Sequence, residues 1–232
     1  MDYFRPASAR GRADFGWLRS AHSFSFGRYY DPQHMGFSVL RVINDDWVAP
    51  ASGFDTHPHR DMEIISYITG GTIEHRDSMG NAYQIPAGDI QVMSAGTGIT
   101  HSEYNASKQD PLTFLQIWIT PAVNSVTPSY AQQAVSDQPG LVWLVSPTGE
   151  NGTLKINQDA RIARIAPNDA QPIELNTAQR FGYLHVVRGS IQVNGQLLTT
   201  GDGAGYVQDR AVTLTFAEQD AEALWFDLPA ID

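Results

Sequence analysis

Short apolar or alternating runs follow one another along the chain, and helical periodicity is scarce. Apolar residues at every second position, or in brief blocks, are typical of β-strands. The clearest runs are Ser38–Ile43, Met62–Ile68, Ile90–Met93, Phe114–Ile119, Leu141–Val145, Tyr183–Val187, Ile191–Val193, Val212–Phe216 and Ala223–Phe226. Turn-forming pairs separate them, and Asn194-Gly195 is a strong hairpin signal. We therefore predict an all-β protein with the strand spacing of a sandwich or a barrel.

One stretch that lacks this patterning divides the chain into two parts. Pro121, Pro128 and Pro139 stand there among Ser, Asn, Gln and Asp residues, a composition typical of a connector. We predict an N-terminal domain over 1–125, a linker over 126–140 and a C-terminal domain over 141–232.

The two parts also share a weak internal similarity. Residues 67–73, Tyr-Ile-Thr-Gly-Gly-Thr-Ile, are similar to residues 185–191, His-Val-Val-Arg-Gly-Ser-Ile. A Gly-Asp pair follows each segment, at 88–89 and at 201–202. This similarity favours two copies of one β module.

Composition narrows the class of protein. The chain has no cysteine, which excludes disulfide scaffolds, thiolate metal sites and a cysteine nucleophile. Its net charge is −10, so we expect no direct binding to nucleic acid or to anionic lipid, which would need clustered Lys and Arg. No apolar stretch is long enough for a secretory signal or a membrane helix. We therefore expect a cytoplasmic protein.

Two pairs of side chains have the spacing of metal ligands. In a strand, residues two apart project from the same face, so His57 and His59 can converge, as can His101 and Glu103. If the two segments face each other across a barrel, three nitrogens and one oxygen meet. A His-x-His pair also occurs by chance or as a polar core pair, and Pro58 between the two suits only an edge strand or a bulge.

Such a donor set would suit a divalent transition metal. Three imidazoles and a carboxylate favour Fe(II), Mn, Ni, Cu or Zn over Ca or Mg. Four ligands on an octahedral ion leave two positions for water, substrate or dioxygen. The isolated residues His22, His34, His75 and His185 are expected to be surface groups or hydrogen-bonded core groups instead.

The context of these residues resembles the cupin superfamily. His57-x-His59, Glu63 and Gly70 have the spacing of the first cupin motif, and Gly80, Pro86-x-Gly88, His101 and Asn105 are similar to the second. His101 lies farther beyond Gly88 than in most cupins. This longer spacing is a feature of the pirin family of bicupins. Several segments of the chain also resemble that family: His22–Phe26, Tyr29–Pro32, Met35–Phe37, Leu40–Asp46 and Met93–Glu103. The resemblance is specific over about residues 1–120 and implies two tandem cupin β-barrels.

The resemblance also implies a single metal in the N-terminal barrel. Carried onto this chain, its ligands are His57, His59, His101 and Glu103, with Fe(II) favoured and Cu, Ni, Mn, Co or Zn as alternatives. Most cupins would use Glu63 as the carboxylate ligand. Here Glu63 becomes a candidate to orient a ligand or, like Glu103, to accept a substrate proton.

The C-terminal copy is expected to lack the site. Offsets of 118 and 113 residues place Leu175, Thr177, Phe181, Leu214 and Phe216 opposite the ligand positions and Glu63. These side chains would fill a barrel rather than bind an ion, so this copy is predicted to be structural.

Two classes of function follow from the resemblance. Pirin-like proteins include quercetin 2,3-dioxygenases, which open a flavonol with O2 and release carbon monoxide; the substrate here would be a flavonol or another phenolic or enolisable metabolite. The alternative is a metal- or redox-sensing regulator that acts through a protein partner without turnover. Fold and ligand set alone do not decide the substrate.

Overall fold

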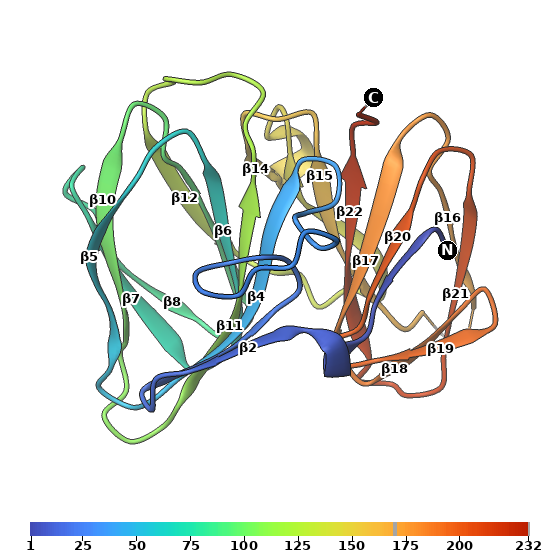
Figure 1. The fold of residues 1–232 in the computed structure, drawn as a ribbon, viewed down its shortest axis with the longest axis horizontal. Helices are drawn as coiled ribbons and strands as arrows, with labels where there is room; N and C mark the ends of the chain where they lie inside the picture. The colour runs from blue at the N-terminus through green and yellow to red at the C-terminus, as the bar shows by residue number, and fades with distance from the viewer. Residues whose placement is uncertain (169–170, 232) are drawn as a thin grey trace.

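The computed structural model describes residues 1–168 and 171–231, and nearly all regular structure in this part is β (Figure 1). All nine runs predicted from the sequence overlap strands. The helical turns are the short 3-10 helices η1 (Ala7–Ala9) and η2 (Glu150–Gly152). In the described part of the chain, none is long and apolar enough to cross a bilayer.

The N-terminal barrel consists of two sheets that close on each other. The larger has the strand order β12-β9-β6-β11-β4-β3-β2 and the smaller β5-β10-β7-β8. Their bounds are β2 Gly11–Asp14, β3 Leu18–His22, β4 Leu40–Val48, β5 Gly53–His59, β6 Glu63–Gly70, β7 Thr72–Asp77, β8 Ala82–Pro86, β9 Asp89–Ser94, β10 Ile99–Asn105, β11 Leu112–Ile119 and β12 Ser129–Ala134.

The C-terminal barrel repeats this plan. Its larger sheet has the order β1-β20-β17-β22-β15-β13-β14 and its smaller sheet β16-β21-β18-β19. The bounds are β1 Tyr3–Arg5, β13 Gly140–Ser146, β14 Leu154–Lys155, β15 Arg161–Ala166, β16 Ile173–Asn176, β17 Phe181–Arg188, β18 Ser190–Val193, β19 Gln196–Thr199, β20 Gly203–Tyr206, β21 Ala211–Phe216 and β22 Glu222–Leu228. The predicted Asn194-Gly195 hairpin joins β18 to β19.

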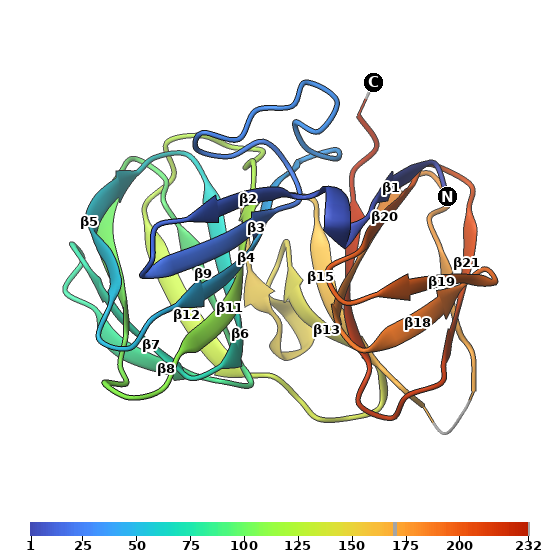
Figure 2. The ribbon, with the colours of Figure 1, turned by 60° about the horizontal axis from the view of Figure 1, so that its bottom comes forward.

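The two larger sheets pack face to face, so the barrels lie side by side (Figures 1 and 2). One apolar cluster contains Ile43, Ile65 and Ile117 from the N-terminal sheet together with Tyr183 and Phe226 from the C-terminal sheet. Successive strand residues point to opposite faces, so these sheets bury one face here and the other inside their own barrel.

Two strands lie where the sequence did not place them. Residues 129–134, assigned to the linker, form β12 and pair with β9 of the N-terminal sheet. Their sequence Ser-Tyr-Ala-Gln-Gln-Ala is mostly polar and half-exposed, so it has no apolar pattern. Residues 3–5, assigned to the N-terminal domain, form β1 and pair with β20 of the C-terminal sheet. Strand pairing of this kind depends on partners that are distant in sequence.

A buried carboxylate joins the two barrels. Glu222 accepts hydrogen bonds from the Tyr67 hydroxyl of the N-terminal barrel at 2.7 Å and from Arg164 Nε at 2.8 Å. Arg188 Nη2 is a third donor at 3.1 Å. Removing one partner of a buried ion pair leaves the other charge uncompensated.

We expect Glu222→Ala to lower the free energy of unfolding by about 3 kcal/mol, because Arg164 then stays buried without a counter-charge. The matched control is Glu150→Ala, which breaks an exposed ion pair with Arg161 and should change stability by less than about 1 kcal/mol. Urea unfolding of both variants measures the difference. Equal stability of the two variants would contradict the prediction.

Candidate metal centre

The interior of the N-terminal barrel is polar in its middle and apolar at its ends. One end is filled by an apolar cluster that includes Ile68 and Phe114, and the other by a cluster that includes Ile64 and Met93. Buried polar side chains lie between them: Asn44, Asp46, Ser66, His75, Gln91, His101, Glu103 and Gln116. Burying so many polar groups costs stability unless they bind each other or a ligand.

The interior of the C-terminal barrel is apolar. The predicted counterpart Leu214 is buried there, with Leu175 and Phe216 packed against the same cluster. Thr177 is also buried. Phe181 differs from the expectation, because it packs against the core between the barrels. Among the described residues, both groups with metal-binding potential lie in the N-terminal barrel.

The histidines at 57, 59 and 101 come from two neighbouring strands. β5 pairs antiparallel with β10, and His57 lies opposite His101 while His59 lies opposite Ile99. The expectation that the two segments face each other across the barrel is therefore corrected: they are hydrogen-bonded neighbours. β5 is the edge strand of its sheet, which accommodates Pro58 because an edge strand has one unpaired side.

Glycines allow the close approach and the sharp turn that this pairing needs. A Cβ at Gly53 would lie 2.4 Å from the Glu103 carbonyl oxygen, so β5 contacts β10 through bare backbone near a register shift. Ahead of β10, Gly96 has a φ of +44° and Gly98 a φ of +134°. This agrees with the turning role that the sequence indicates for them.

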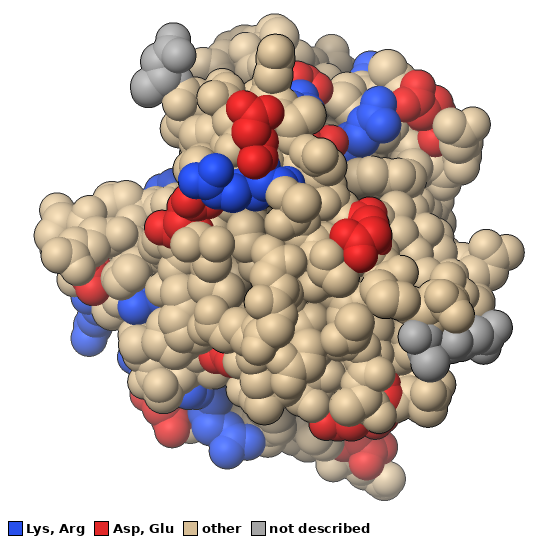
Figure 3. Space-filling model, turned by 90° about the vertical axis from the view of Figure 1, so that its right-hand side faces the viewer, with Lys and Arg blue, Asp and Glu red and all other residues tan. Residues whose placement is uncertain are grey.

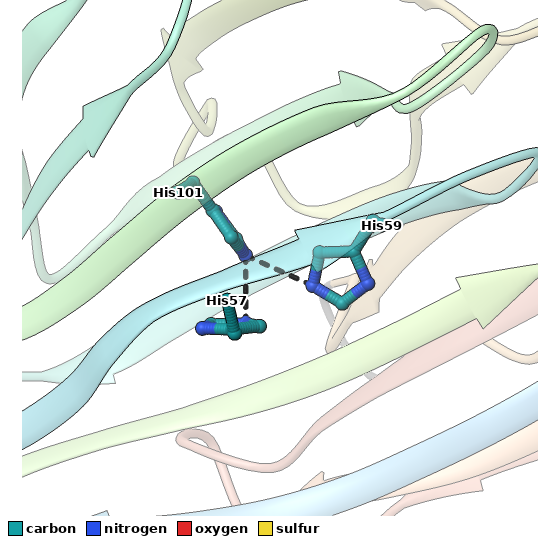
Figure 4. A group of neighbouring side chains, drawn as sticks. All are labelled: His57, His59 and His101. Carbon is teal, nitrogen blue, oxygen red and sulfur yellow. Dashed lines mark hydrogen bonds between the residues drawn. The ribbon is translucent and has the colours of Figure 1, made fainter.

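The three rings converge on one point, as Figure 4 shows. His101 Nε2 lies 3.1 Å from Nε2 of His57 and 3.1 Å from Nε2 of His59. We call these three residues the histidine cluster. Metal–nitrogen bonds of about 2.1 Å at right angles would separate two nitrogens by about 3 Å. The spacing therefore fits a transition-metal cation.

The protonation of the rings agrees with this fit. Burial, with the neighbouring histidines, lowers the pKa of His59 to about 4. Burial and His57 lower the pKa of His101 to about 3. Both imidazoles are thus neutral near pH 7 and present lone pairs, which a cation can bind without first displacing a proton.

Glu103 is buried beside the histidine cluster and held by three donors. Gln91 Nε2 donates to Oε1 at 2.7 Å, and Gln116 Nε2 donates to Oε2 at 3.0 Å. The Ser66 hydroxyl is a weaker donor to Oε1 at 3.3 Å. Ligand atoms of Glu103, His101 and His75 lie within 4.8 Å of one another. The structure thus brings Glu103 to His101, and His101 belongs both to this group and to the group with His57 and His59.

Glu63 lies apart from these residues. Its Oε2 accepts a 2.6 Å hydrogen bond from the Ser94 hydroxyl, and its Oε1 accepts a 3.1 Å bond from Asn157 Nδ2. Asn157 belongs to the C-terminal half of the chain. The observed contacts of Glu63 therefore join the two halves, and the metal-capable groups do not include it.

His75, which the sequence led us to expect as a surface group or a hydrogen-bonded core group, is a core group that neighbours the site. It is fully buried, its Nε2 lies 3.1 Å from Asp77 Oδ2, and its ring centroid is 5.3 Å from that of His101. β7 pairs with β10 so that His75 lies opposite Glu103 and Asp77 opposite His101. His75 and Asp77 are two residues apart, as are the residues of each predicted ligand pair. This spacing was the signal in the sequence that could have placed His75 beside the site.

A cavity of about 850 Å³ opens onto the histidine cluster. Its lining includes His57, His59 and Glu103, and a second polar group, His22 and Asp46, comes from β3 and β4. Cavities of about 300–1,000 Å³ bind small molecules of drug size. The cavity thus offers space for an organic ligand beside the converging nitrogens.

Aromatic side chains form much of the remaining wall. Trp118 lies edge-on to both His59 and Phe26, with ring centroids 5.2 and 5.3 Å apart. Tyr29 and Trp17 also line the cavity. Flat aromatic surfaces favour a planar ligand.

Comparisons with known proteins agree with the architecture. A family model described as Pirin matches residues 3–119, and one described as Quercetinase C-terminal cupin domain matches residues 143–228. The chain is 47% identical over 232 residues to a protein named quercetin 2,3-dioxygenase from Escherichia coli (strain K12), with 100% of both chains covered. A pirin-like protein from Caulobacter vibrioides is 42% identical, over 96% of this chain and 97% of that protein.

A solved structure shows the same fold. The crystal structure of the bacterial pirin YhhW from Escherichia coli in complex with nickel(II) has a TM-score of 0.94 and 46% identity to this chain, and the match covers 99% of each. The all-β fold of two tandem cupin barrels predicted from the sequence is confirmed. The chain belongs to the pirin family.

Proposed function

We propose that this protein is a metal-dependent dioxygenase that uses O2 to open the ring of a flavonol or a related phenol, with release of carbon monoxide. The observation that carries the proposal is the convergence of three imidazole nitrogens beside a cavity large enough for a flavonol, with His57 and His59 in the cavity wall. The relative named quercetin 2,3-dioxygenase supports this substrate class.

In this proposal His57, His59, His101 and Glu103 hold one divalent cation. Fe(II) is our favoured metal; the nickel(II) complex of the related bacterial pirin supports nickel as an alternative, and Cu, Mn, Co and Zn suit similar donors. When bound, such a cation lowers the pKa of a coordinated hydroxyl group and brings an electron-rich phenolate together with O2.

The chain itself supplies orientation and a dry environment. Trp118 and Phe26 would contact the face or edge of a planar substrate beside His59. Gln91 and Gln116 hold the Glu103 carboxylate in place, which keeps its oxygens oriented. Burial of these groups in a cavity strengthens each polar contact with the substrate.

The other predictions on partners and location stay predictions. On the face in Figure 3, acidic and basic side chains are scattered among uncharged ones rather than gathered in a basic patch. The net charge of −10 motivates our expectation of no direct nucleic-acid binding. A protein partner, as in the regulatory alternative, and a cytoplasmic location belong to the same set of untested predictions.

The test uses the full-length protein, stripped of metal and reloaded with Fe(II), Ni(II), Cu(II), Mn(II), Co(II) or Zn(II) under nitrogen. Addition of air-saturated buffer and quercetin should cause loss of flavonol absorbance, O2 uptake and carbon monoxide release in at least one loaded form and none in the stripped form. Metal-loaded protein that consumes neither quercetin nor any other phenol would contradict the proposal. Binding of a protein by that inactive form would favour the regulatory alternative.

A further inference from the structure

We propose that Asp46 is the catalytic residue that accepts the proton of the substrate hydroxyl group. The inference rests on the proposed function and adds a residue that neither cupin motif contains. In the step, the O–H bond of the phenol breaks and its electron pair stays on the oxygen. The proton binds a carboxylate oxygen of Asp46, which becomes a neutral carboxyl group.

The position of Asp46 carries the inference. It lies in β4, between β3 and β11, and its side chain lines the same cavity as His57, His59 and Glu103. The residue is 4% exposed. Its Oδ1 is buried and has no hydrogen-bond partner within the described residues. A buried acceptor without a donor is costly, and a substrate hydroxyl group would supply that donor.

The other carboxylates of the cavity are less suited to this role. Both oxygens of Glu103 already accept hydrogen bonds from Gln91 and Gln116. Asp14 is exposed and caps the backbone N–H of Gly16. Of the three carboxylates that line the cavity, Asp46 thus combines burial with an oxygen, Oδ1, that accepts no hydrogen bond from the described residues.

The environment of Asp46 also suits proton transfer near neutral pH. Burial raises its pKa to about 7; the Ser20 hydroxyl and Arg10 act against this, and Asp45 and Glu103 add to it. The other polar groups of the cavity wall come from every strand and loop around Asp46. They are His22 on β3, Asn44 on β4 itself, Gln116 on β11, His57 and His59 on β5, Arg12 and Asp14 on β2, and Arg28 and Tyr29 in the loop between β3 and β4. A cation bound by the histidine cluster would lower the pKa of Asp46. The metal-loaded protein should therefore become active at a lower pH than the pKa of Asp46 in the metal-free protein implies.

The experiment compares wild type with Asp46→Asn, and uses Asp45→Asn as the matched control. Asp45 directly precedes Asp46 on β4. Its side chain is more exposed than that of Asp46 and forms an ion pair with Arg10. Quercetin is added under nitrogen to each metal-loaded protein across pH 5–9. Absorbance then reports whether the bound flavonol is neutral or ionised. Metal content and unfolding are measured on the same samples.

We expect wild type and Asp45→Asn to bind the ionised flavonol at pH 7, whereas Asp46→Asn binds the neutral form with unchanged metal content. Turnover of Asp46→Asn should fall by about 100-fold or more, and the acidic limb of its pH–rate profile should disappear. Asp46→Glu, which restores a carboxylate, should recover part of the rate.

The metal-free protein gives an independent readout. The folded pKa of Asp46 lies above its unfolded value of 3.8, so the stability that the neutral carboxyl contributes is present below about pH 4 and lost as the pH rises toward 7. The stability of Asp46→Asn should not fall in this way between about pH 4 and pH 7.

The outcomes separate the two proposals. If wild type turns over quercetin and Asp46→Asn keeps both the ionised-flavonol spectrum and the acidic limb, the role of Asp46 is wrong while the dioxygenase function stands. If metal-loaded wild type binds neither quercetin nor any other phenol, the dioxygenase function fails and the role of Asp46 fails with it.

Discussion

Replacing His101 with alanine should abolish tight metal binding and, with it, oxygenation. His101 is the centre of the histidine cluster, because its Nε2 is 3.1 Å from Nε2 of both His57 and His59. Changing groups that merely orient a ligand lowers metal affinity by about 10- to 100-fold, so loss of a ligand should exceed 100-fold. That factor corresponds to about 2.8 kcal/mol of binding free energy.

The metal content after dialysis and the dissociation constant from a chelator competition measure this effect. His34→Ala is the matched control, since His34 lies outside the metal-capable groups and contacts Tyr3. The stability of the metal-free forms shows whether His101→Ala still folds, and His101→Gln provides a more conservative change. Wild-type metal affinity in a folded His101→Ala protein would overturn the assignment of the centre.

Replacing Glu103 with alanine should lower both the metal affinity and the stability, whereas replacing Glu63 should lower the stability alone. Glu103→Ala should lose metal affinity by at least about 10-fold. It should also destabilise the metal-free protein by about 3 kcal/mol, because Gln91, Gln116 and Ser66 lose their common acceptor. Glu63→Ala should lower stability through Ser94 and Asn157 but leave the metal affinity close to wild type.

Metal analysis of the two variants, side by side with urea unfolding, distinguishes a ligand from a structural carboxylate. Both glutamates are buried and hydrogen-bonded, so each serves as the control for the other. Metal retained by Glu103→Ala and lost by Glu63→Ala would mean that this chain uses the carboxylate of the first cupin motif. The ligand set would then have to be reassigned.

The histidine cluster could be predicted because its signal is local. The step from His57 to His59 sets both side chains on one face of a strand, whatever the strand pairs with. The apolar runs predicted their strands for the same reason, since a period of two depends only on neighbouring positions. The apolar residue at Leu214 likewise indicated a C-terminal barrel filled by its own side chains, and this residue is buried there.

Strand pairing could not be predicted in this way. The sequence suggested that the two ligand segments face each other across the barrel, but His57 is paired with His101 on the adjacent strand. β12 had no apolar pattern, and β1 crosses to the other barrel. Register and partner depend on backbone hydrogen bonds between distant segments, which the pattern of one segment does not encode.

The functional candidates that the sequence missed are polar residues whose meaning depends on their surroundings. Asp46 follows another aspartate, a pair that in the sequence is typical of a turn, but in the structure it lies within β4 together with Asn44. Both are buried in the fold, as is His75 beside His101. Burial is what changes such residues from solvated groups into candidates for chemistry.

The amino-acid sequence by itself determined the β-strands and the placement of His57 and His59 on one strand face, because both follow from short-range spacing along a strand. The two-barrel plan followed from the internal similarity of the two halves and from the resemblance to the pirin family. The tertiary structure alone decided that β5 and β10 are neighbours, that Glu63 contacts Ser94 and Asn157 instead of the cluster, and that Asp46 lines the cavity. Those features depend on which distant segments surround each side chain and exclude water from it. The sequence of one segment does not specify these neighbours, because they come together only when the sheets close and pack.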